Sequence, residues 1–246
     1  MHSTAKQENR GLISKDDMQQ LLHVFSHDLR NPLINLEALL RDSEQHCIGD
    51  SATPEQWHDM RENMTMMQSV VQGMNQRIHG VQEVYRAIFE PVHTESVNIK
   101  ALLDVEIEGC RRDACLGDSV SVSLQVDGEV WADALMLRNM FRELLHNAAQ
   151  ALQGHAEAHI SIEQSQRRGM DVFSVRDCGI GISAHDQQCI FQPFFSLVQR
   201  NGLGLAKVKA WVQAHGGEVW CESKEDVGSI FYISLPEKKT SMDVAI

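Results

Sequence analysis

His27-Asp-Leu-Arg-Asn-Pro-Leu33 lies within a long amphipathic pattern near the start of this chain. Apolar residues recur around it in steps of three and four, at Leu22, Phe25, Leu29, Leu33, Leu36 and Leu40. This spacing puts one apolar stripe on an α-helix, which we expect from about Lys15 to His46. His27 and Asn31 are four residues apart and therefore share a face of that helix.

A second apolar pattern follows a break at residues 48–54, where Gly, Asp, Ser and Pro cluster. Thr53 is expected to cap this second helix, with Pro54 at its first position, and Glu90-Pro91 is expected to end it. Its apolar members continue for about four heptads as Trp57, Met60, Met64, Met67, Val71, Met74, Ile78, Val81, Tyr85 and Ile88.

Two long helices with a short connection form an antiparallel hairpin. A lone hairpin cannot bury apolar stripes of this length on both helices, whereas two paired hairpins bury them in a four-helix bundle. We therefore expect a homodimer through the hairpin. The alternative is that the stripes pack on the remaining part of the same chain.

From Val92 onward the pattern mixes strands and helices, which predicts an α+β domain with one sheet covered by helices. Strands are expected at 120–126, 158–163, 171–176, 218–222 and 229–235, and helices at 134–152 and 203–214. The expected division is a leader at 1–14, the hairpin at 15–91, the α+β domain at 92–236 and a disordered tail at 237–246.

Composition excludes several classes of function. A formal net charge of −12 over 246 residues, without a basic stripe, argues against nucleic-acid binding through phosphate contacts. No apolar run approaches the roughly 20 residues that span a bilayer, so this segment is expected to be cytoplasmic. An inner-membrane anchor of the full-length protein would belong to a further N-terminal region. The six cysteines form no CxxC pair, and we interpret them as free thiols rather than disulfides or zinc ligands.

His27 is the candidate nucleophile, since a neutral imidazole attacks electrophiles at neutral pH. Asp28 could fix a ring nitrogen or accept the proton. Pro32 removes the hydrogen bond to the carbonyl of Asp28, which predicts a bend just after His27. A surface histidine beside an incidental proline is the alternative, and the complete seven-residue string argues against it.

That string closely resembles the H-box of sensor histidine kinases. In this family the histidine accepts the γ-phosphoryl group of ATP, and the acidic residue that follows assists proton removal. The residue at the position of Asn31 is implicated in dephosphorylating the partner response regulator. The resemblance therefore implies these roles for His27, Asp28 and Asn31.

Four further segments resemble the nucleotide-binding boxes of the family, in the family's order. Arg142–Leu152 is similar to the N-box, in which Asn147 matches the Mg²⁺ ligand. Glu143 stands where many members have Asn; it could hold the metal through water or orient His27.

Asp177-Cys-Gly-Ile-Gly181 is similar to the G1 box, with an aspartate that can accept a hydrogen bond from adenine. Gly179 and Gly181 would allow close approach of the base and ribose.

Ile190-Phe-Gln-Pro-Phe-Phe195 is similar to the F-box, whose aromatic residues could anchor a mobile lid or simply belong to the core. Asn201–Lys207 is similar to the G2 box. There Gly202, Gly204 and Leu205 open a helix whose N–H groups could bind phosphate oxygens. Arg200 replaces the usual first glycine; it could meet the β- or γ-phosphate or be solvated.

The resemblance covers residues 15–236 and implies the Bergerat-type α/β sandwich of the GHKL superfamily. It implies an ATP- and Mg²⁺-dependent kinase that phosphorylates His27 and passes the group to an aspartate of a response regulator, with phosphatase activity as an addition. Two alternatives remain: a phosphatase-biased or degenerate member with little kinase activity, and a GHKL ATPase without phosphohistidine.

Overall fold

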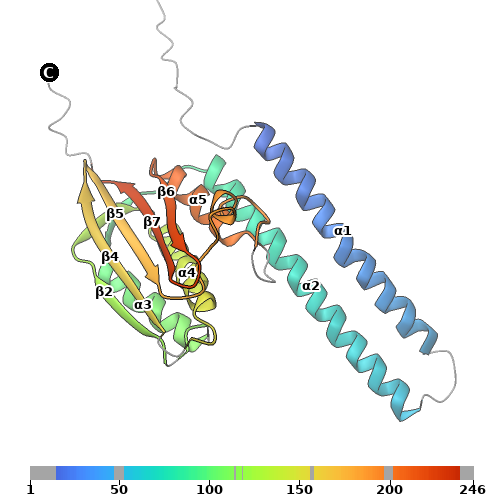
Figure 1. Cartoon of the computed structure of the whole chain (residues 1–246). Coiled ribbons are helices and arrows are strands. Elements are labelled where there is room, and N and C mark those ends of the chain that lie inside the picture. Colours follow the sequence, from blue (N-terminus) through green and yellow to red (C-terminus); the bar gives the residue numbers. More distant parts are fainter. Residues whose placement is uncertain are drawn as a thin grey trace, which may run out of the picture. The chain divides into compact units, whose positions relative to one another are not determined.

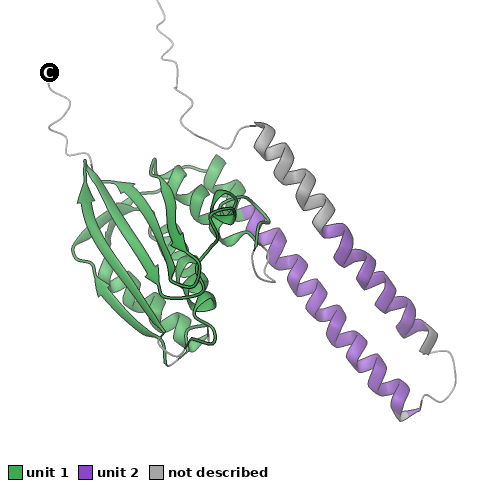
Figure 2. Ribbon diagram, in the orientation of Figure 1, with its two compact units in different colours: residues 1–12, 83–197, 202–246 green, residues 13–82, 198–201 purple. Residues whose placement is uncertain are grey.

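The computed structural model describes residues 15–46, 53–113, 115–117, 119–155, 158–196 and 202–238. The chain divides into two compact units, one holding the helices up to Gln82 and one that begins at Glu83 (Figure 2). Each unit is described by itself. The first is a pair of long helices and the second is a layered α/β domain (Figure 1).

The first unit is the predicted helical hairpin. It consists of α1 (Lys15–His46) and the greater part of α2 (Pro54–Phe89). The side chain of Asn63 ties the two helices together near their connection, because its Nδ2 donates to Asp42 Oδ2 at 2.8 Å and to Ser43 Oγ at 3.4 Å. Pro32 lies inside α1, and the helix continues through it.

The start of α2 follows the predicted capping pattern. The backbone N–H of Gln56 donates to Thr53 Oγ1 at 3.3 Å, and the N–H of Thr53 donates to Gln56 Oε1 at 2.8 Å. This reciprocal pair is a capping box, which satisfies two backbone donors that the first helical turn leaves unpaired. Pro54 occupies the first helical position, where the missing N–H costs no hydrogen bond.

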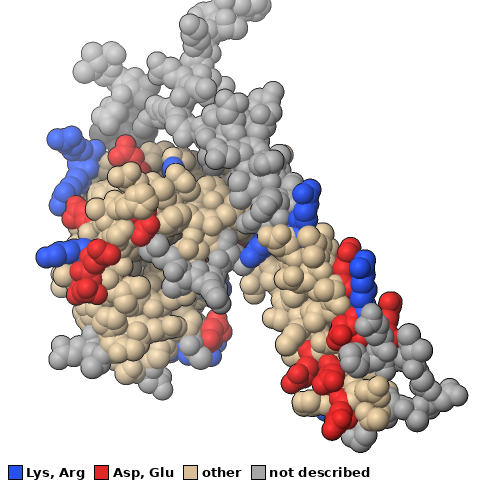
Figure 3. All heavy atoms as spheres, turned by 45° about the vertical axis from the view of Figure 1, so that its right-hand side comes forward, with Lys and Arg blue, Asp and Glu red and all other residues tan. Residues whose placement is uncertain are grey.

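The hairpin keeps much of its apolar surface exposed. Six members of the two predicted stripes are between 43% and 59% exposed: Leu33, Leu40, Trp57, Met64, Val71 and Tyr85. Acidic side chains are prominent near the α1–α2 connection on the face seen in Figure 3. A large exposed apolar surface of this kind is typical of an association surface.

The second unit is built on a five-stranded sheet in the order β2-β4-β5-β7-β6. Its strands are β2 (Ser121–Gln125), β4 (His159–Arg167), β5 (Met170–Asp177), β6 (Val219–Lys224) and β7 (Gly228–Pro236). Only the β2–β4 pair is parallel; the other three pairs are antiparallel. A separate two-stranded ribbon pairs β1 (Glu95–Asn98) with β3 (Glu129–Ala132).

Three helices form a layer on one face of the sheet (Figure 1). They are α3 (Ile99–Arg112), α4 (Ala134–Ala151) and α5 (Gly204–Ala214), with α4 packed against both neighbours and against β5 and β7. Phe141 of α4 and Phe173 of β5 are completely buried, and their rings meet edge to face with centroids 5.5 Å apart. Burying each such ring contributes about 1.5–3 kcal/mol. The predicted α+β architecture is confirmed.

Among the described α-helices and strands, three were absent from the sequence prediction: α3, β1 and β3. The helix has a clear local signal, because Asn98 caps it by accepting a hydrogen bond from the N–H of Ala101 at 2.8 Å. The two strands are only four residues long, which is too short for a period-two pattern to stand out.

The end of the described chain also lies against this domain. The N–H of Glu237 donates to the carbonyl oxygen of Gly169 at 3.1 Å, and Lys238 Nζ lies 4.2 Å from the ring centroid of Trp131. Both residues were assigned to the tail by the sequence. Residues 239–246 lie outside the described residues.

Candidate active site

The predicted phosphoacceptor segment is helical throughout. His27 and Asp28 belong to α1, but their side chains lie outside the described part of the chain. Asn31 follows one helical turn after His27, and its side chain is exposed. Because residues four apart share a helix face, the face of α1 that carries His27 is also the face of an accessible amide.

Helix α4 carries the predicted N-box. Asp133 fixes its start, since Oδ1 accepts hydrogen bonds from the N–H groups of Leu135 at 3.1 Å and Met136 at 3.0 Å. Two turns further on, Glu143 and Asn147 are half-buried on the same side of the helix. Within the described residues, Nδ2 of Asn147 is buried without a hydrogen-bond partner. Such a group is costly unless a ligand or water satisfies it.

The carboxylate of Glu143 lies at the start of α5. It forms an ion pair with Lys207, and Lys207 Nζ also lies 3.0 Å from Glu83 Oε2. A Cβ atom added to Gly204 would lie only 2.7 Å from Glu143 Oε2. Burial alone would lower the pKa of Lys207, but Glu143 and then Glu83 act in the opposite direction, and the net pKa is raised. The ammonium group is therefore charged at neutral pH.

Asp177 ends β5 in a buried position, with only 4% of the residue exposed. Its Oδ1 accepts from the N–H of Gly179 at 2.9 Å and from the N–H of Ser229 at 3.3 Å. Burial raises the pKa of Asp177, although these two hydrogen bonds oppose the shift. Both of these bonds fix Oδ1, so Oδ2 is the oxygen that can receive a further donor.

The two glycines of the predicted G1 box pack against the chain's own backbone. A Cβ atom on Gly179 would lie 2.4 Å from the carbonyl oxygen of Ala151, at the end of α4. Gly181 has a φ of +66°, and a Cβ atom there would lie 2.0 Å from the carbonyl oxygen of Lys224. These contacts require glycine without any ligand. The predicted need for space beside a base and ribose stays a prediction.

The predicted F-box and G2 box meet each other. The N–H of Phe194 donates to the carbonyl oxygen of Gly202 at 2.8 Å, and a Cβ atom on Gly202 would lie 2.4 Å from the Phe194 carbonyl carbon. Phe195 is half-buried beside this junction. Arg200, for which two roles were predicted, lies outside the described residues.

Helix α5 begins at Gly204, directly after this junction. Leu203 precedes it, is buried, and provides no side-chain hydrogen bond to cap the helix. Leu205 is half-buried in the first turn. An N-terminus without a side-chain cap keeps N–H donors available for an anion.

Comparison with known proteins agrees with this arrangement. Residues 132–239 match the family model described as "Histidine kinase-, DNA gyrase B-, and HSP90-like ATPase". The sensor histidine kinase ZraS of Escherichia coli (strain K12) is 28% identical over 227 residues, which are 89% of this chain and 45% of that protein.

Solved structures of histidine kinases share the fold. The mycobacterial sensor histidine kinase MprB matches with a TM-score of 0.51 at 25% identity, over 60% of this chain and 100% of that one. The histidine kinase ThkA, in a crystal structure with the response regulator protein TrrA, matches with a TM-score of 0.63 at 19% identity. That match covers 89% of this chain and 61% of the other.

Over most of its length the chain is similar to sensor histidine kinases. It carries a helical hairpin followed by an α/β sandwich of the ATPase type, a fold that it shares with solved histidine kinases. It spans about half the length of the E. coli relative. In the part of the chain that the structure describes, no helix is both long and apolar enough to cross a membrane.

The sequence pattern does not indicate the ionic partners of the candidate site. In the sequence, Lys207 is only the last residue of the segment that resembles the G2 box, and Glu83 is only one residue of the expected second helix. Lys207 pairs with Glu143, 64 positions away, and with Glu83, 124 positions away, so no local spacing could indicate either ion pair. The available signal is a lysine within the largely apolar helix expected at 203–214, since a lysine that becomes buried is normally paired.

Proposed function

We propose that this chain is the catalytic core of a two-component sensor histidine kinase that transfers the γ-phosphoryl group of ATP to His27 and then to an aspartate of a response regulator. The observation that carries the proposal is the combination, in one chain, of His27-Asp-Leu-Arg-Asn-Pro-Leu33 on a helical hairpin with a domain of the histidine kinase-like ATPase family. Functionally, residues 15–91 would carry the phosphoacceptor and residues 92–236 the nucleotide site.

The adenine of ATP is assigned to the end of β5. Asp177 Oδ2 would accept a hydrogen bond from the exocyclic amino group, because Oδ1 is already held by two backbone N–H groups. The phosphates are assigned to the start of α5, where Gly204 and Leu205 present backbone N–H groups. Lys207, in the first turn of α5, adds a positive charge to the same region.

Mg²⁺ is the implied metal, and the residues on α4 fit it. Asn147 offers its carboxamide oxygen, and Glu143 offers a carboxylate one helical turn earlier. The buried Nδ2 of Asn147, which has no partner among the described residues, would then donate to a ligand such as a phosphate oxygen. Oxygen ligands of this kind are what Mg²⁺ prefers. When bound, the ion would neutralise charge on the phosphates. Glu143 would then have to exchange part of its contact with Lys207 for the hydrated metal.

At His27 the reaction is an in-line displacement. One imidazole nitrogen forms a bond to the γ-phosphorus, the bond between that phosphorus and the β–γ bridging oxygen breaks, and ADP leaves. The imidazole proton passes to Asp28 or to water. Catalysis rests on positioning and charge neutralisation, as in other phosphoryl transfers.

Two properties of the hairpin support the proposed partners. The exposed apolar stripes, including Trp57, Met64 and Val71, support a homodimer in which two hairpins cover each other. Asn31 is exposed on the predicted face of His27, which supports contact with a response regulator and a role in its dephosphorylation. ThkA, which has the same fold, was solved in complex with such a protein. Because the proposed reaction needs ATP and a response regulator, we also propose that this segment lies in the cytoplasm.

The decisive experiment is incubation with γ-labelled ATP and Mg²⁺. Wild type is expected to acquire an acid-labile, alkali-stable label, and His27→Ala is expected to acquire none. His79→Ala is the matched control, because His79 is an exposed histidine on the other helix. Label on His27→Ala would show that the nucleophile is a different residue. ATP binding without label on wild type would favour the phosphatase-biased alternative, and phosphate release without phosphoprotein would favour a plain ATPase.

A further inference from the structure

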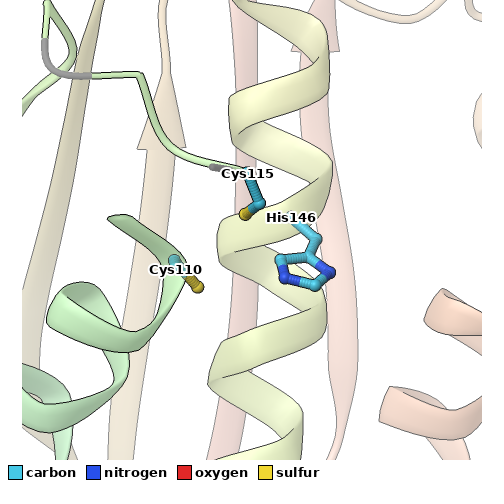
Figure 4. Close-up of side chains that lie close together, drawn as sticks. All are labelled: Cys110, Cys115 and His146. Atoms are coloured by element: carbon cyan, nitrogen blue, oxygen red, sulfur yellow. The ribbon is translucent and has the colours of Figure 1, made fainter. Parts of the chain in front are cut away.

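Two cysteines and a histidine meet on the helical side of the ATPase domain (Figure 4). Cys110 lies in the last turn of α3, Cys115 lies in the segment that follows, and His146 lies on α4. One ligand atom from each, two sulfurs and a ring nitrogen, all lie within 4.8 Å of one another. No local sequence pattern indicates this cluster, since His146 is more than 30 residues away from both cysteines.

The backbone after α3 brings the two sulfurs together. The N–H groups of Cys115 and Leu116 both donate to the carbonyl oxygen of Cys110 at 3.0 Å. Leu116 is buried, which anchors this turn to the core. Cys110 is only 1% exposed, whereas Cys115 and His146 are half-buried. The cluster is therefore rigid on one side and reachable from solvent on the other.

The geometry suits a tetrahedral metal ion. Zinc binds sulfur at about 2.3 Å and histidine nitrogen at about 2.0–2.1 Å, so tetrahedral ligands of one ion lie about 3.6–3.8 Å apart. The three ligand atoms lie within 4.8 Å of one another, and side-chain rotations that move them by about 1 Å would bring them to that spacing. Two thiolates would balance the charge of Zn²⁺, which matters at a site as buried as Cys110. A fourth, open position would face solvent beside Cys115 and His146.

We propose that Cys110, Cys115 and His146 form a zinc-binding site that links the end of α3 to the N-box helix. Thiolate and imidazole ligands favour zinc over Mg²⁺ or Ca²⁺, which prefer oxygen ligands. His146 directly precedes Asn147, so an ion here would fix α4 at the point where it enters the candidate nucleotide site. The site itself does not depend on the proposed phosphotransfer.

Without a metal ion, the thiol of Cys110 is expected to have low reactivity. Burial, followed by the neighbouring Cys115, raises the pKa of Cys110 to about 12. Its thiol is therefore protonated at neutral pH and a weak nucleophile. Zinc binding would displace thiol protons, so proton release accompanies it. None of the five cysteines in the described part of the chain forms a disulfide, and Cys47 lies outside that part.

The test is a zinc titration of the full chain, reduced and stripped of metal, against a chelating dye. Wild type is expected to bind one Zn²⁺ per chain, and Cys115→Ser and His146→Gln are each expected to weaken binding at least about 100-fold, since losing a ligand costs more than losing a supporting hydrogen bond. Cys221→Ser is the matched control, because Cys221 lies on β6 outside the cluster. Co²⁺ is expected to give near-ultraviolet thiolate absorption that falls by about half in Cys115→Ser, the variant with one of the two thiolates.

Three results would overturn the proposal. The first is equal zinc affinity in wild type and in both cluster variants. The second is a cobalt complex without thiolate absorption. The third is loss of two titratable thiols on mild oxidation, together with no tight zinc binding by the reduced chain, which would make the pair a disulfide instead. None of these readouts uses ATP, so they stand apart from any failure of phosphotransfer.

Discussion

Replacing Lys207 by Met is expected to destabilise the ATPase domain. This lysine on α5 neutralises two carboxylates, Glu83 on α2 and Glu143 on α4. Its side chain is only 15% exposed, and it pairs with Glu143 and, at 3.0 Å, with Glu83. Its ammonium group also lies 5.6 Å from the ring centroid of Trp211. Met preserves the apolar stem and removes only the charge.

The magnitude follows from the exposure of the three side chains. Charges 3.0 Å apart attract by about 5–6 kcal/mol at an effective dielectric constant of 20, and desolvation offsets much of this. An exposed pair contributes about 0–1 kcal/mol, whereas removing one partner of a buried pair costs about 3–5 kcal/mol. With Glu143 20% exposed and Glu83 36% exposed, the expected loss lies between these limits, at about 2–3 kcal/mol.

Urea unfolding with the slope checked against wild type measures this loss. Lys209→Met is the matched control on the same helix and is expected to change the free energy of unfolding by less than about 0.5 kcal/mol. Adding Glu143→Gln to Lys207→Met is expected to recover part of the loss, since it removes one of two unbalanced charges. The raised pKa of Lys207 means that its contribution is intact below pH 10.5 and is lost above it. A Lys207→Met variant within about 0.5 kcal/mol of wild type would refute this reasoning.

Two further predictions concern the G1 segment. Gly181→Ala is expected to cost more than about 3 kcal/mol, because a positive φ and a clash with the Lys224 carbonyl oxygen combine; Gly154→Ala, with a positive φ but open space around it, is expected to cost only about 1 kcal/mol in the same thermal unfolding assay. Asp177→Asn is expected to weaken ATP binding at least about tenfold by calorimetry, without lowering the stability of the ligand-free domain. The pKa of Asp177 is raised by burial, so its ionisation lowers stability as pH rises from the ordinary value of 3.8 through the raised one. The Asn variant is expected to lack that pH dependence, and an unchanged profile would contradict the assignment.

Periodicity alone was enough to predict the hairpin. The steps of three and four in both stripes predicted α1 and α2, and the helix from Lys15 to His46 has the bounds that were expected. The break at Thr53-Pro54 also predicted Thr53 as the N-cap of α2, and in the structure its hydroxyl accepts from the N–H of Gln56. These features depend on residues within one turn of each other, which is the range over which a sequence pattern carries physical information.

Pairings over long sequence distances could not be predicted in the same way. Glu106 lies in α3 with its side chain 2% exposed, and its two oxygens meet Arg138 at 3.1 Å and Arg142 at 3.0 Å. A glutamate on a helix is ordinarily taken as a solvent-facing residue. Its burial depends on cations 32 and 36 positions away on α4, so it becomes visible only when α3 and α4 are packed together.

The glycines of the G1 box were predicted from the motif, but the physical reason that the structure gives for them is a different one. The pattern predicted positions where only a hydrogen fits, and the structure has such positions at Gly179 and Gly181. The atoms that exclude a Cβ are, however, the carbonyl oxygens of Ala151 and Lys224. The loop is thus built by packing between the end of α4 and the β6–β7 turn. A nucleotide would bind a shape that the chain already maintains by itself.

The cysteines show the converse, because residues that form no sequence motif can still converge in space. Without a CxxC pair the thiols were interpreted as isolated, yet Cys110 and Cys115 converge with His146 because a turn after α3 folds back onto α4. Helix α4 therefore presents His146 to this cluster and Glu143 and Asn147 to the candidate nucleotide site, from adjacent turns. Because a helix moves as a rigid element over so short a span, an ion that fixes His146 also limits how far Asn147 can shift. Occupancy of the cluster and ATP affinity are then expected to be linked, and by reciprocity each should change the other by the same factor.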